Sequence, residues 1–211
     1  MSISSIRKDY QLRSLSESEV HASPVAQFSQ WWDEAIASEI DEVNAMTLST
    51  ITTAGRPSAR IVLLKGFDEK GFVFYTNYHS DKGTSIEHHA KVGLAFFWPP
   101  LERQVIIKGE AVKLSSQASD SYFKSRPKGS QIGAIVSDQS KVISDRSIME
   151  AKLEALEIEY AEKEVPRPEH WGGYVVKPQC IEFWQGRPNR LHDRMRCQLQ
   201  GNFWNIERLA P

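Results

Sequence analysis

Five short runs of β-branched and aromatic residues fill the chain between residues 45 and 114. The runs are AMTLSTIT, SARIVLLK, GFVFYTNY, VGLAFFWPP and RQVIIKGEAVKL, with turn residues between them, as at Ala54-Gly55-Arg56-Pro57 and Asp68-Glu69-Lys70-Gly71. Such runs are typical of strands, and connections this short suit antiparallel neighbours. The segment therefore predicts an antiparallel barrel or sandwich rather than alternating strands and helices.

Helices are predicted on both sides of this segment. A first helix begins at Ser23-Pro24, a capping residue followed by proline, and carries one apolar face: Val25, Phe28, Trp32, Ala35 and Ile36. Residues 115–126 predict a helix that Pro127 stops, and a Gly/Ser-broken stretch follows to Ser140. Residues 144–163 predict an acidic helix with one apolar face: Met149, Leu153, Leu156 and Tyr160.

The last part of the chain returns to strand patterns. The segments are WGGYVVKPQ, then CIEFWQ joined by a turn to RLHDRMRCQLQ, and finally NFWNIERLAP. Because helices separate them from the first five strands, we expect them to complete the same sheet. The expected organisation is a mobile polar arm over residues 1–22 and a single domain over 23–211, with a helical subregion at about 115–163.

The overall charge excludes several classes of partner. With 26 basic and 27 acidic side chains, the formal charge is −1, so a non-specific nucleic-acid or membrane-surface protein is not expected. No apolar run approaches the ~18 residues of a membrane span, and the first residues lack the apolar core of a signal peptide. We therefore expect a cytoplasmic protein. Its two cysteines, Cys180 and Cys197, are expected to be reduced packing residues that lie near each other across a hairpin.

One predicted hairpin is unusually rich in nitrogen-bearing side chains. In EFWQGRPNRLHDR, the turn is Gly186-Arg187-Pro188-Asn189, flanked by two strands. Arg190, His192 and Arg194 then fall at alternate positions of the second strand, so all three are expected to point to one face. Arg187 is expected to be solvated.

Familiar catalytic motifs are missing from the sequence. It has no Gly-rich phosphate loop, no nucleophile elbow and no metal-ligand spacing, so no metal is expected. What remains is a set of cations and amides near apolar strands: Arg60, Lys65, Lys82, Gln104 and Arg126. Each alone can be a strand-end charge. Together they suggest sites for a phosphorylated, aromatic ligand.

Seven ordered stretches resemble the pyridoxamine 5′-phosphate oxidase family. They are RIVLLK, FYTNYHSDK, FFWPPLERQV, SYFKSRPKGSQIGAIVSDQS, WGGYVVKP, EFWQGRPNRLHDR and the terminal ERLAP. The resemblance implies an α+β, mainly β fold: an antiparallel Greek-key split β-barrel of the FMN-binding type, with peripheral helices. It also implies a homodimer with FMN between subunits. The implied reaction is oxidation of pyridoxamine or pyridoxine 5′-phosphate to pyridoxal 5′-phosphate by O2, with release of H2O2.

The same resemblance implies roles for individual residues. The implied FMN contacts are Arg60, Ile61, Val62, Leu63, Leu64, Lys65, Tyr75, Thr76, Lys82, Gln104, Gln139, Ser140, Trp184 and Arg194. The implied cradle for the substrate phosphate is Lys65, Tyr122, Arg126 and Ser130. Arg190 and His192 resemble the catalytic pair beside the substrate ring, and Arg7 and Tyr10 an arm that closes over it. His192 is expected to take part in proton transfer, whereas a guanidinium such as Arg190 does not readily act as a base.

Two features depart from simple expectation. Arg60 and Lys65 are five residues apart, on opposite faces of a regular strand. The family usually reads Ser-Arg-Lys where this chain has Ser80-Asp81-Lys82, which predicts weaker retention of FMN. Two other functions stay open: a catalytically silent flavin- or pyridoxal-phosphate-binding protein, and a relative that reduces another substrate with a different flavin-type cofactor.

Overall fold

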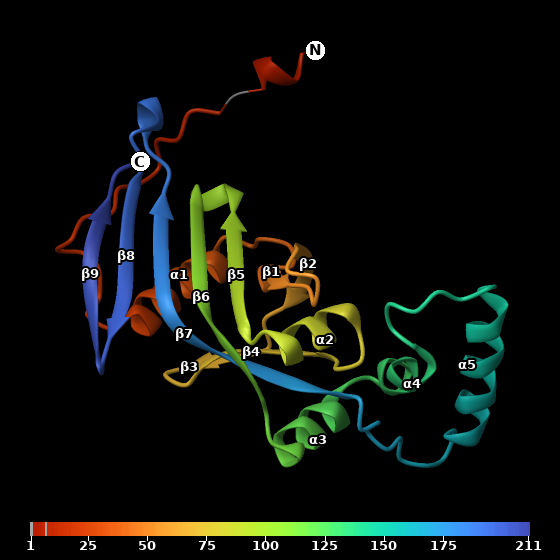
Figure 1. Ribbon diagram of the computed structural model, residues 1–211. Coiled ribbons are helices and arrows are strands. Elements are labelled where there is room, and N and C mark those ends of the chain that lie inside the picture. The colour runs from red at the N-terminus through yellow and green to blue at the C-terminus, as the bar shows by residue number, and fades with distance from the viewer. Residues whose placement is uncertain (1, 7) are drawn as a thin grey trace.

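A single curled antiparallel sheet dominates the computed structural model, which describes residues 2–6 and 8–211 (Figure 1). Its strand order is β2-β1-β5-β6-β7-β4-β3, and β8 and β9 continue the sheet from β7. The strands are β1 Ala45–Ile51, β2 Pro57–Leu63, β3 Gly66–Asp68, β4 Gly71–Asn77, β5 Lys91–Trp98, β6 Arg103–Lys113, β7 Trp171–Gln185, β8 Asp193–Gln200 and β9 Phe203–Leu209. The predicted antiparallel barrel, completed by the late strands, is confirmed.

The long strand β7 divides the sheet into two parts. Its first half pairs with β4 and its second half with β8, while β6 runs beside both halves. The pairing register of β6 and β7 shifts between Lys108 and Gly109, which leaves Gln179 of β7 as an extra, bulged residue where the two parts meet. The predicted separate strands WGGYVVKPQ and CIEFWQ are therefore wrong, because Pro178 sits at this irregularity without ending the strand.

Helix α1 (Pro24–Ala37) covers one face of the sheet and closes the main core. Its start is as predicted, since the Ser23 side chain accepts from the Ala26 N–H at 3.2 Å. Phe28 and Trp31 are buried, and their rings meet those of Phe72 and Phe183 at 4.9 and 5.3 Å between centroids. Burial of each such side chain stabilises the folded state by roughly 1.5–3 kcal/mol relative to leaving it exposed. The predicted apolar face was wrong at Ile36, which is exposed near the end of the helix.

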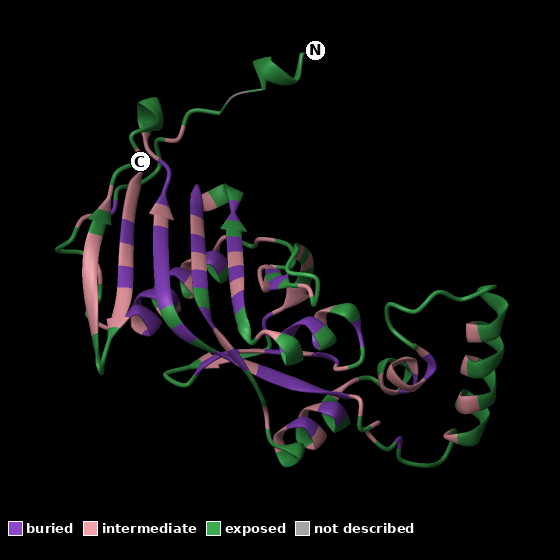
Figure 2. Cartoon of the chain, viewed as in Figure 1, coloured by how far each residue is buried: buried purple, intermediate pink, exposed green. Residues whose placement is uncertain are grey.

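The remaining helices gather beside the other end of the sheet (Figure 1). They are α2 Asp81–His88, α3 Ser116–Ser125, α4 Lys128–Val136 and α5 Ser147–Glu159; short 3-10 turns are η1 Ile3–Ser5, η2 Pro99–Leu101 and η3 Pro188–Arg190. Helix α4 was not expected in its Gly/Ser-rich segment. A second core beneath α4 and α5 holds Phe123, Ile132, Val136, Val165 and Trp171, and the predicted apolar face of α5 packs against it. The rest of α5 is exposed (Figure 2).

Both cysteines and part of the N-terminal segment are buried. Among the described residues, Cys180 and Cys197 are buried free thiols on neighbouring strands, and burial raises the pKa of Cys197 to about 12, as suits packing residues. Leu15, within the predicted arm, is buried in the main core. No helix of the described chain is both long and apolar enough to span a bilayer.

Candidate functional site

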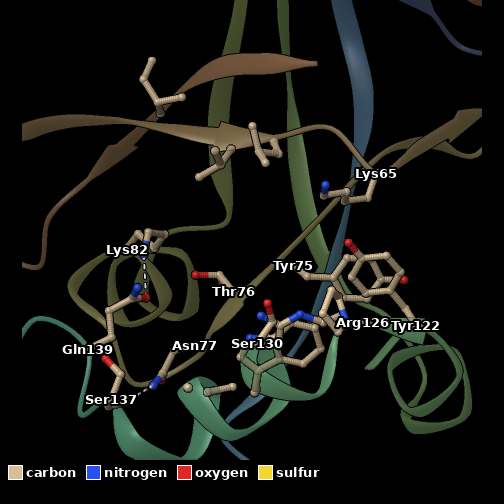
Figure 3. Close-up of a pocket in the computed structure, with 17 residues that line it drawn as sticks. Lys65, Tyr75, Thr76, Asn77, Lys82, Tyr122, Arg126, Ser130, Ser137 and Gln139 are labelled. Carbon is tan, nitrogen blue, oxygen red and sulfur yellow. Dashed lines mark hydrogen bonds between the residues drawn. The ribbon is translucent and has the colours of Figure 1, made fainter. Parts of the chain in front are cut away.

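A cavity of about 660 Å³ opens between the sheet and the helices α2, α3 and α4 (Figure 3). Its volume lies in the range of pockets that hold a cofactor or a drug-sized ligand. Its lining comes from β2, β4, α2, α3, α4, the start of β7 and the adjoining loops. The lining residues are Ile61, Val62, Leu63, Lys65, Tyr75, Thr76, Asn77, Lys82, Tyr122, Arg126, Pro127, Ser130, Gly133, Ala134, Ser137, Gln139 and Trp171.

The charged side chains of this lining are all cationic. They are Lys65, Lys82 and Arg126, and no Asp or Glu joins them within the described part of the chain. In Figure 3, Lys82 lies at one side of the cavity, whereas Lys65 and Arg126 lie at the other. A single site therefore offers two separate positive regions, which suits a ligand or a pair of ligands carrying two anionic groups.

The first positive region is built at the N-terminus of α2. Ser80 caps this helix, and Lys82 in its first turn donates from Nζ to Gln139 Oε1 at 2.9 Å and to Ser80 Oγ at 3.3 Å. Burial and the nearby Arg60 lower the pKa of Lys82, while Asp81 opposes that shift. Asp81 itself is exposed in the same first turn, outside the cavity lining.

The second positive region is framed by stacked aromatic rings. Tyr75 and Tyr122 stack with centroids 3.8 Å apart, and Trp171 lies parallel to Tyr75 at 5.5 Å. The Arg126 guanidinium lies 4.6 Å from the Trp171 ring centre. Its Nη1 atom is buried and has no hydrogen-bond partner among the residues described, and burial lowers the pKa of Arg126. A buried guanidinium N–H without an acceptor is costly unless another group, such as an anion, completes it.

The end of β2 explains how Arg60 and Lys65 can serve different regions. The strand stops at Leu63; the Leu64 N–H then bonds to Asn44 and the Lys65 N–H to Val73, so the chain changes partner before Lys65. Lys65 enters the cavity, whereas Arg60 bonds to Leu48, Thr50 and Ser58 beside it. Leu64 is buried in the core, so its side chain is not available to a ligand.

A second group of predicted residues lies away from this cavity, in another part of the sheet. Gln104, Trp184 and Arg194 occupy facing positions on β6, β7 and β8, which makes one row across the sheet. Arg194 donates to Glu182 at 2.8 Å and to the Ala210 carbonyl at 2.9 Å. The adjoining turn η3 and the C-terminus lie at the opposite end of the molecule from α4 (Figure 1). One copy of the chain therefore separates the two groups.

The hairpin geometry corrects the expected single face of Arg190, His192 and Arg194. Strand β8 begins at Asp193, and Asn189 and Arg190 both have positive φ, 57° and 62°, in the turn η3. Arg190 and His192 thus precede the strand, and alternation does not apply to them. Nor is Arg187 merely solvated: its Nε lies 3.5 Å from the Asp193 carboxylate.

His192 sits in an aromatic corner at the end of the row. Its ring lies 4.6 Å from Trp184 and 5.9 Å from Tyr10. The Arg187 backbone N–H donates to His192 Nδ1 at 3.1 Å, so the neutral ring carries its proton on Nε2. Burial and Arg190 lower the pKa of His192, which favours this neutral form. In this arrangement, His192 offers an N–H donor; accepting a proton would require Nδ1 to give up its bond to Arg187.

Two residues predicted for the site, Ser140 and Arg7, lie outside the cavity lining or outside the described residues, and several lining residues were not predicted. Ser140, at a positive φ of 72°, is exposed and lines a neighbouring cavity beside Gln139. Arg7 lies outside the described residues. Sequence reasoning missed the cavity residues Asn77, Ser137 and Trp171. Of these, only Trp171 could have been found from the sequence: it is an aromatic residue at the start of a predicted strand. That strand, β7, pairs with β4, which contains the cavity residue Tyr75.

Comparison with known families gives two matches. A family model described as "Pyridoxamine 5′-phosphate oxidase" matches residues 32–159. A second, described as "Pyridoxine 5′-phosphate oxidase C-terminal dimerisation region", matches residues 171–211. The second match contains the Trp184 and Arg194 row and the turn with Arg190 and His192.

Full-length relatives and solved structures agree with these matches. The pyridoxine/pyridoxamine 5′-phosphate oxidase of Cyanothece sp. is 55% identical, covering 100% of this chain and 99% of that protein. The protein of the same name from Flavobacterium psychrophilum is 53% identical, with 99% of each chain covered. PhzG from Burkholderia lata, solved with tetrahydrophenazine-1-carboxylic acid, superposes with a TM-score of 0.90 at 27% identity, covering 95% of this chain and 100% of that one. A pyridoxamine 5′-phosphate oxidase-related, FMN-binding protein from Nostoc punctiforme gives a TM-score of 0.71 at 14% identity, covering 91% and 100%, which shows the shared split-barrel fold.

Proposed function

This chain belongs to the pyridoxamine 5′-phosphate oxidase family, and we propose that it oxidises pyridoxamine 5′-phosphate and pyridoxine 5′-phosphate to pyridoxal 5′-phosphate. In this proposal FMN is the cofactor, O2 the final electron acceptor and H2O2 the second product, which takes up the two hydrogens removed from the substrate. Oxidation of the amine also consumes water and releases ammonia. The observation that carries the proposal is the cavity with two separated positive regions and no acidic residue in its described lining.

The residues present fit a phosphorylated flavin. Lys82, at the capped start of α2, together with Gln139 and the nearby Arg60, suits the FMN phosphate, because a helix N-terminus and cations both favour an anion. Ile61, Val62 and Leu63 give an apolar wall for a flat ring system, and Tyr75 and Thr76 face it from β4. We place FMN along this wall.

The aromatic region suits the phosphate of the substrate. Arg126 has a buried, unpartnered Nη1, and Lys65, Tyr122 and Ser130 line the same part of the cavity. A phosphate ester presents acceptor oxygens to several donors at once, and a guanidinium binds them in a fixed geometry. We therefore propose that this region selects phosphorylated over unphosphorylated pyridoxine.

A second copy of the chain would complete each site. The match to a dimerisation region covers residues 171–211, which hold Trp184, Arg190, His192 and Arg194. Because these residues lie away from the cavity of their own chain, we propose that they reach the cavity of the partner in a two-fold homodimer. Gln104 belongs to the same row and would approach the flavin with them.

The reaction requires a hydride and a proton to leave the substrate. Bound FMN supplies the hydride acceptor. The chain's own residues anchor the phosphate through Lys65 and Arg126, which fixes the distance between the reacting carbon and the cofactor. Arg190 adds fixed positive charge, and neutral His192 donates from Nε2 to orient the substrate. Stacked rings and the arm at Tyr10 exclude water from the closed site.

One assay separates this proposal from its alternatives. Purified protein is mixed with FMN and pyridoxine 5′-phosphate in air, and pyridoxal 5′-phosphate and H2O2 are followed together. The proposal predicts equal amounts of both products. Flavin binding without turnover would instead support a silent binding protein. Turnover of tetrahydrophenazine-1-carboxylic acid, the molecule bound in the PhzG structure, but not of the vitamin phosphate would move the activity to another substrate class.

A further inference from the structure

Glu102 is a buried carboxylate that no part of the proposed chemistry uses. It lies in the turn between β5 and β6, is 2% exposed and has a positive φ of 56°. A buried charge must be paired or hydrogen-bonded, and a non-glycine residue in the left-handed region persists where its surroundings fix it. Its contacts therefore show what holds this residue in place.

The partners of the Glu102 carboxylate all belong to the N-terminal arm. Oε2 accepts from two consecutive backbone N–H groups, those of Gln11 at 2.8 Å and Leu12 at 3.1 Å. Oε1 lies 3.5 Å from Nζ of Lys8. These partners flank Tyr10 on both sides. Since backbone donors are fixed in the chain, the two bonds to Oε2 set the path of the arm at Tyr10 itself.

The backbone of Glu102 contacts the hairpin on which Tyr10 rests. Its carbonyl accepts from the Gly186 N–H at 2.8 Å and from the Gln185 side chain at 3.2 Å. The Tyr10 ring packs directly over Gly186 and makes an edge contact with Trp184 at 5.6 Å. One residue thus joins the segment that carries Tyr10 to the segment that leads to His192.

We propose that Glu102 is a positioning residue for the reaction: its carboxylate holds the arm so that Tyr10 covers the Trp184–His192 corner. This inference rests on the proposed function, because the corner matters only if it faces the substrate. Glu102 does not touch the substrate and acts through Tyr10. Its loss should therefore weaken substrate binding more than the chemical step.

The test compares Glu102→Ala and Glu102→Gln with the control change Glu110→Gln in β6. Glu102→Ala leaves the two arm N–H groups without an acceptor, and we expect KM for pyridoxine 5′-phosphate to rise about tenfold with kcat changed less than about threefold. Glu102→Gln keeps one acceptor oxygen and should recover part of the loss, and Glu110→Gln should match the parent. In the background of Tyr10→Ala, Glu102→Ala should raise KM little further.

A second readout does not depend on catalysis. Trypsin can cut the arm after Lys8 and Arg13, and mass spectrometry of the folded protein measures the rate. We expect faster cleavage in both Glu102 variants than in Glu110→Gln, with melting temperatures compared to exclude unfolding. If cleavage is faster but the protein never turns over pyridoxine 5′-phosphate, the hold of Glu102 on the arm is supported and the proposed function is rejected. Unchanged KM and unchanged cleavage in Glu102→Ala would overturn the inference.

Discussion

The guanidinium of Arg126 lies 4.6 Å from the centre of the Trp171 ring, and its buried Nη1 has no hydrogen-bond partner among the described residues. The aromatic face holds the cation by its ring quadrupole and leaves the nitrogen edge available. Arg126 ends α3 just before Pro127, and Trp171 begins β7, so helix and sheet together fix this group.

Removal of this cation should act on phosphorylated substrates in particular. Arg126→Met keeps much of the packing on Trp171 and removes a charge-assisted bond of about 2–3 kcal/mol, so kcat/KM for pyridoxine 5′-phosphate should fall roughly 30- to 150-fold. Whatever turnover is measured with unphosphorylated pyridoxine provides the control and should change little. Equal losses with both substrates would show that Arg126 does not read the phosphate.

Asp81 should weaken FMN binding from the first turn of α2. Its carboxylate is exposed beside Lys82, so solvent reduces the repulsion to on the order of 1 kcal/mol, and Asp81→Arg should tighten FMN binding about fivefold or more. Fluorescence titration of the apoprotein measures this. Asp81→Asn should give an intermediate affinity, since it removes the negative charge without adding a positive one. An affinity that is unchanged or weaker in Asp81→Arg would count against this role.

The pH dependence should follow the lowered pKa of His192. Burial and Arg190 hold this pKa below its ordinary value of 6.5, so the neutral form persists as pH falls through 6.5. Activity should therefore be retained at pH 6.5 and decline below it. The unfolded chain takes up this proton first, so the contribution of His192 to stability is present above pH 6.5 and decreases as pH falls. NMR titration of the His192 ring, assigned with His192→Gln, checks the direction; a pKa above 6.5 would contradict it.

Gly186 should be intolerant of a side chain because of Tyr10. A Cβ at Gly186 would lie 2.6 Å from Cγ and 2.7 Å from Cβ of Tyr10, so Gly186→Ala should displace the arm. We expect a raised KM and a smaller effect on kcat. The double variant Gly186→Ala/Tyr10→Gly should be no worse than Tyr10→Gly alone, because glycine at position 10 removes the side-chain atoms that the new Cβ would meet. Additive losses would mean that Gly186 serves the hairpin backbone rather than the arm.

The sheet could be predicted from the sequence because each strand is marked by residues within its own short segment. Runs such as GFVFYTNY and the cap at Ser23-Pro24 carry their own strand and helix signals, and both are found in the structure. Helix α4 was missed because its glycines and serines lower helix propensity, whereas burial of Ile132 and Val136 against α5 stabilises it. Tertiary packing decided this element.

Site residues could be predicted where they belong to motifs of the family. They could not be predicted where their position depends on the conformation of a turn or on contacts with distant segments. Lys65, Lys82, Tyr122 and Arg126, all named from family motifs, line one cavity. The placement of Arg190 and His192 before β8 was not predictable, because it depends on positive φ at two successive turn residues. Glu102 has no local signal at all: its partners are about 90 positions away in the chain.

A mixed dimer tests most directly whether two copies build each site. One chain carries Arg126→Met, which disables the cavity, and the other carries Arg190→Met, which disables the hairpin; different affinity tags allow the mixed dimer to be purified. Each homodimer should be nearly inactive. In the mixed dimer one site combines both changes and the other combines neither, so turnover per dimer should recover to roughly half that of the parent. A mixed dimer no more active than the two homodimers would contradict the shared site.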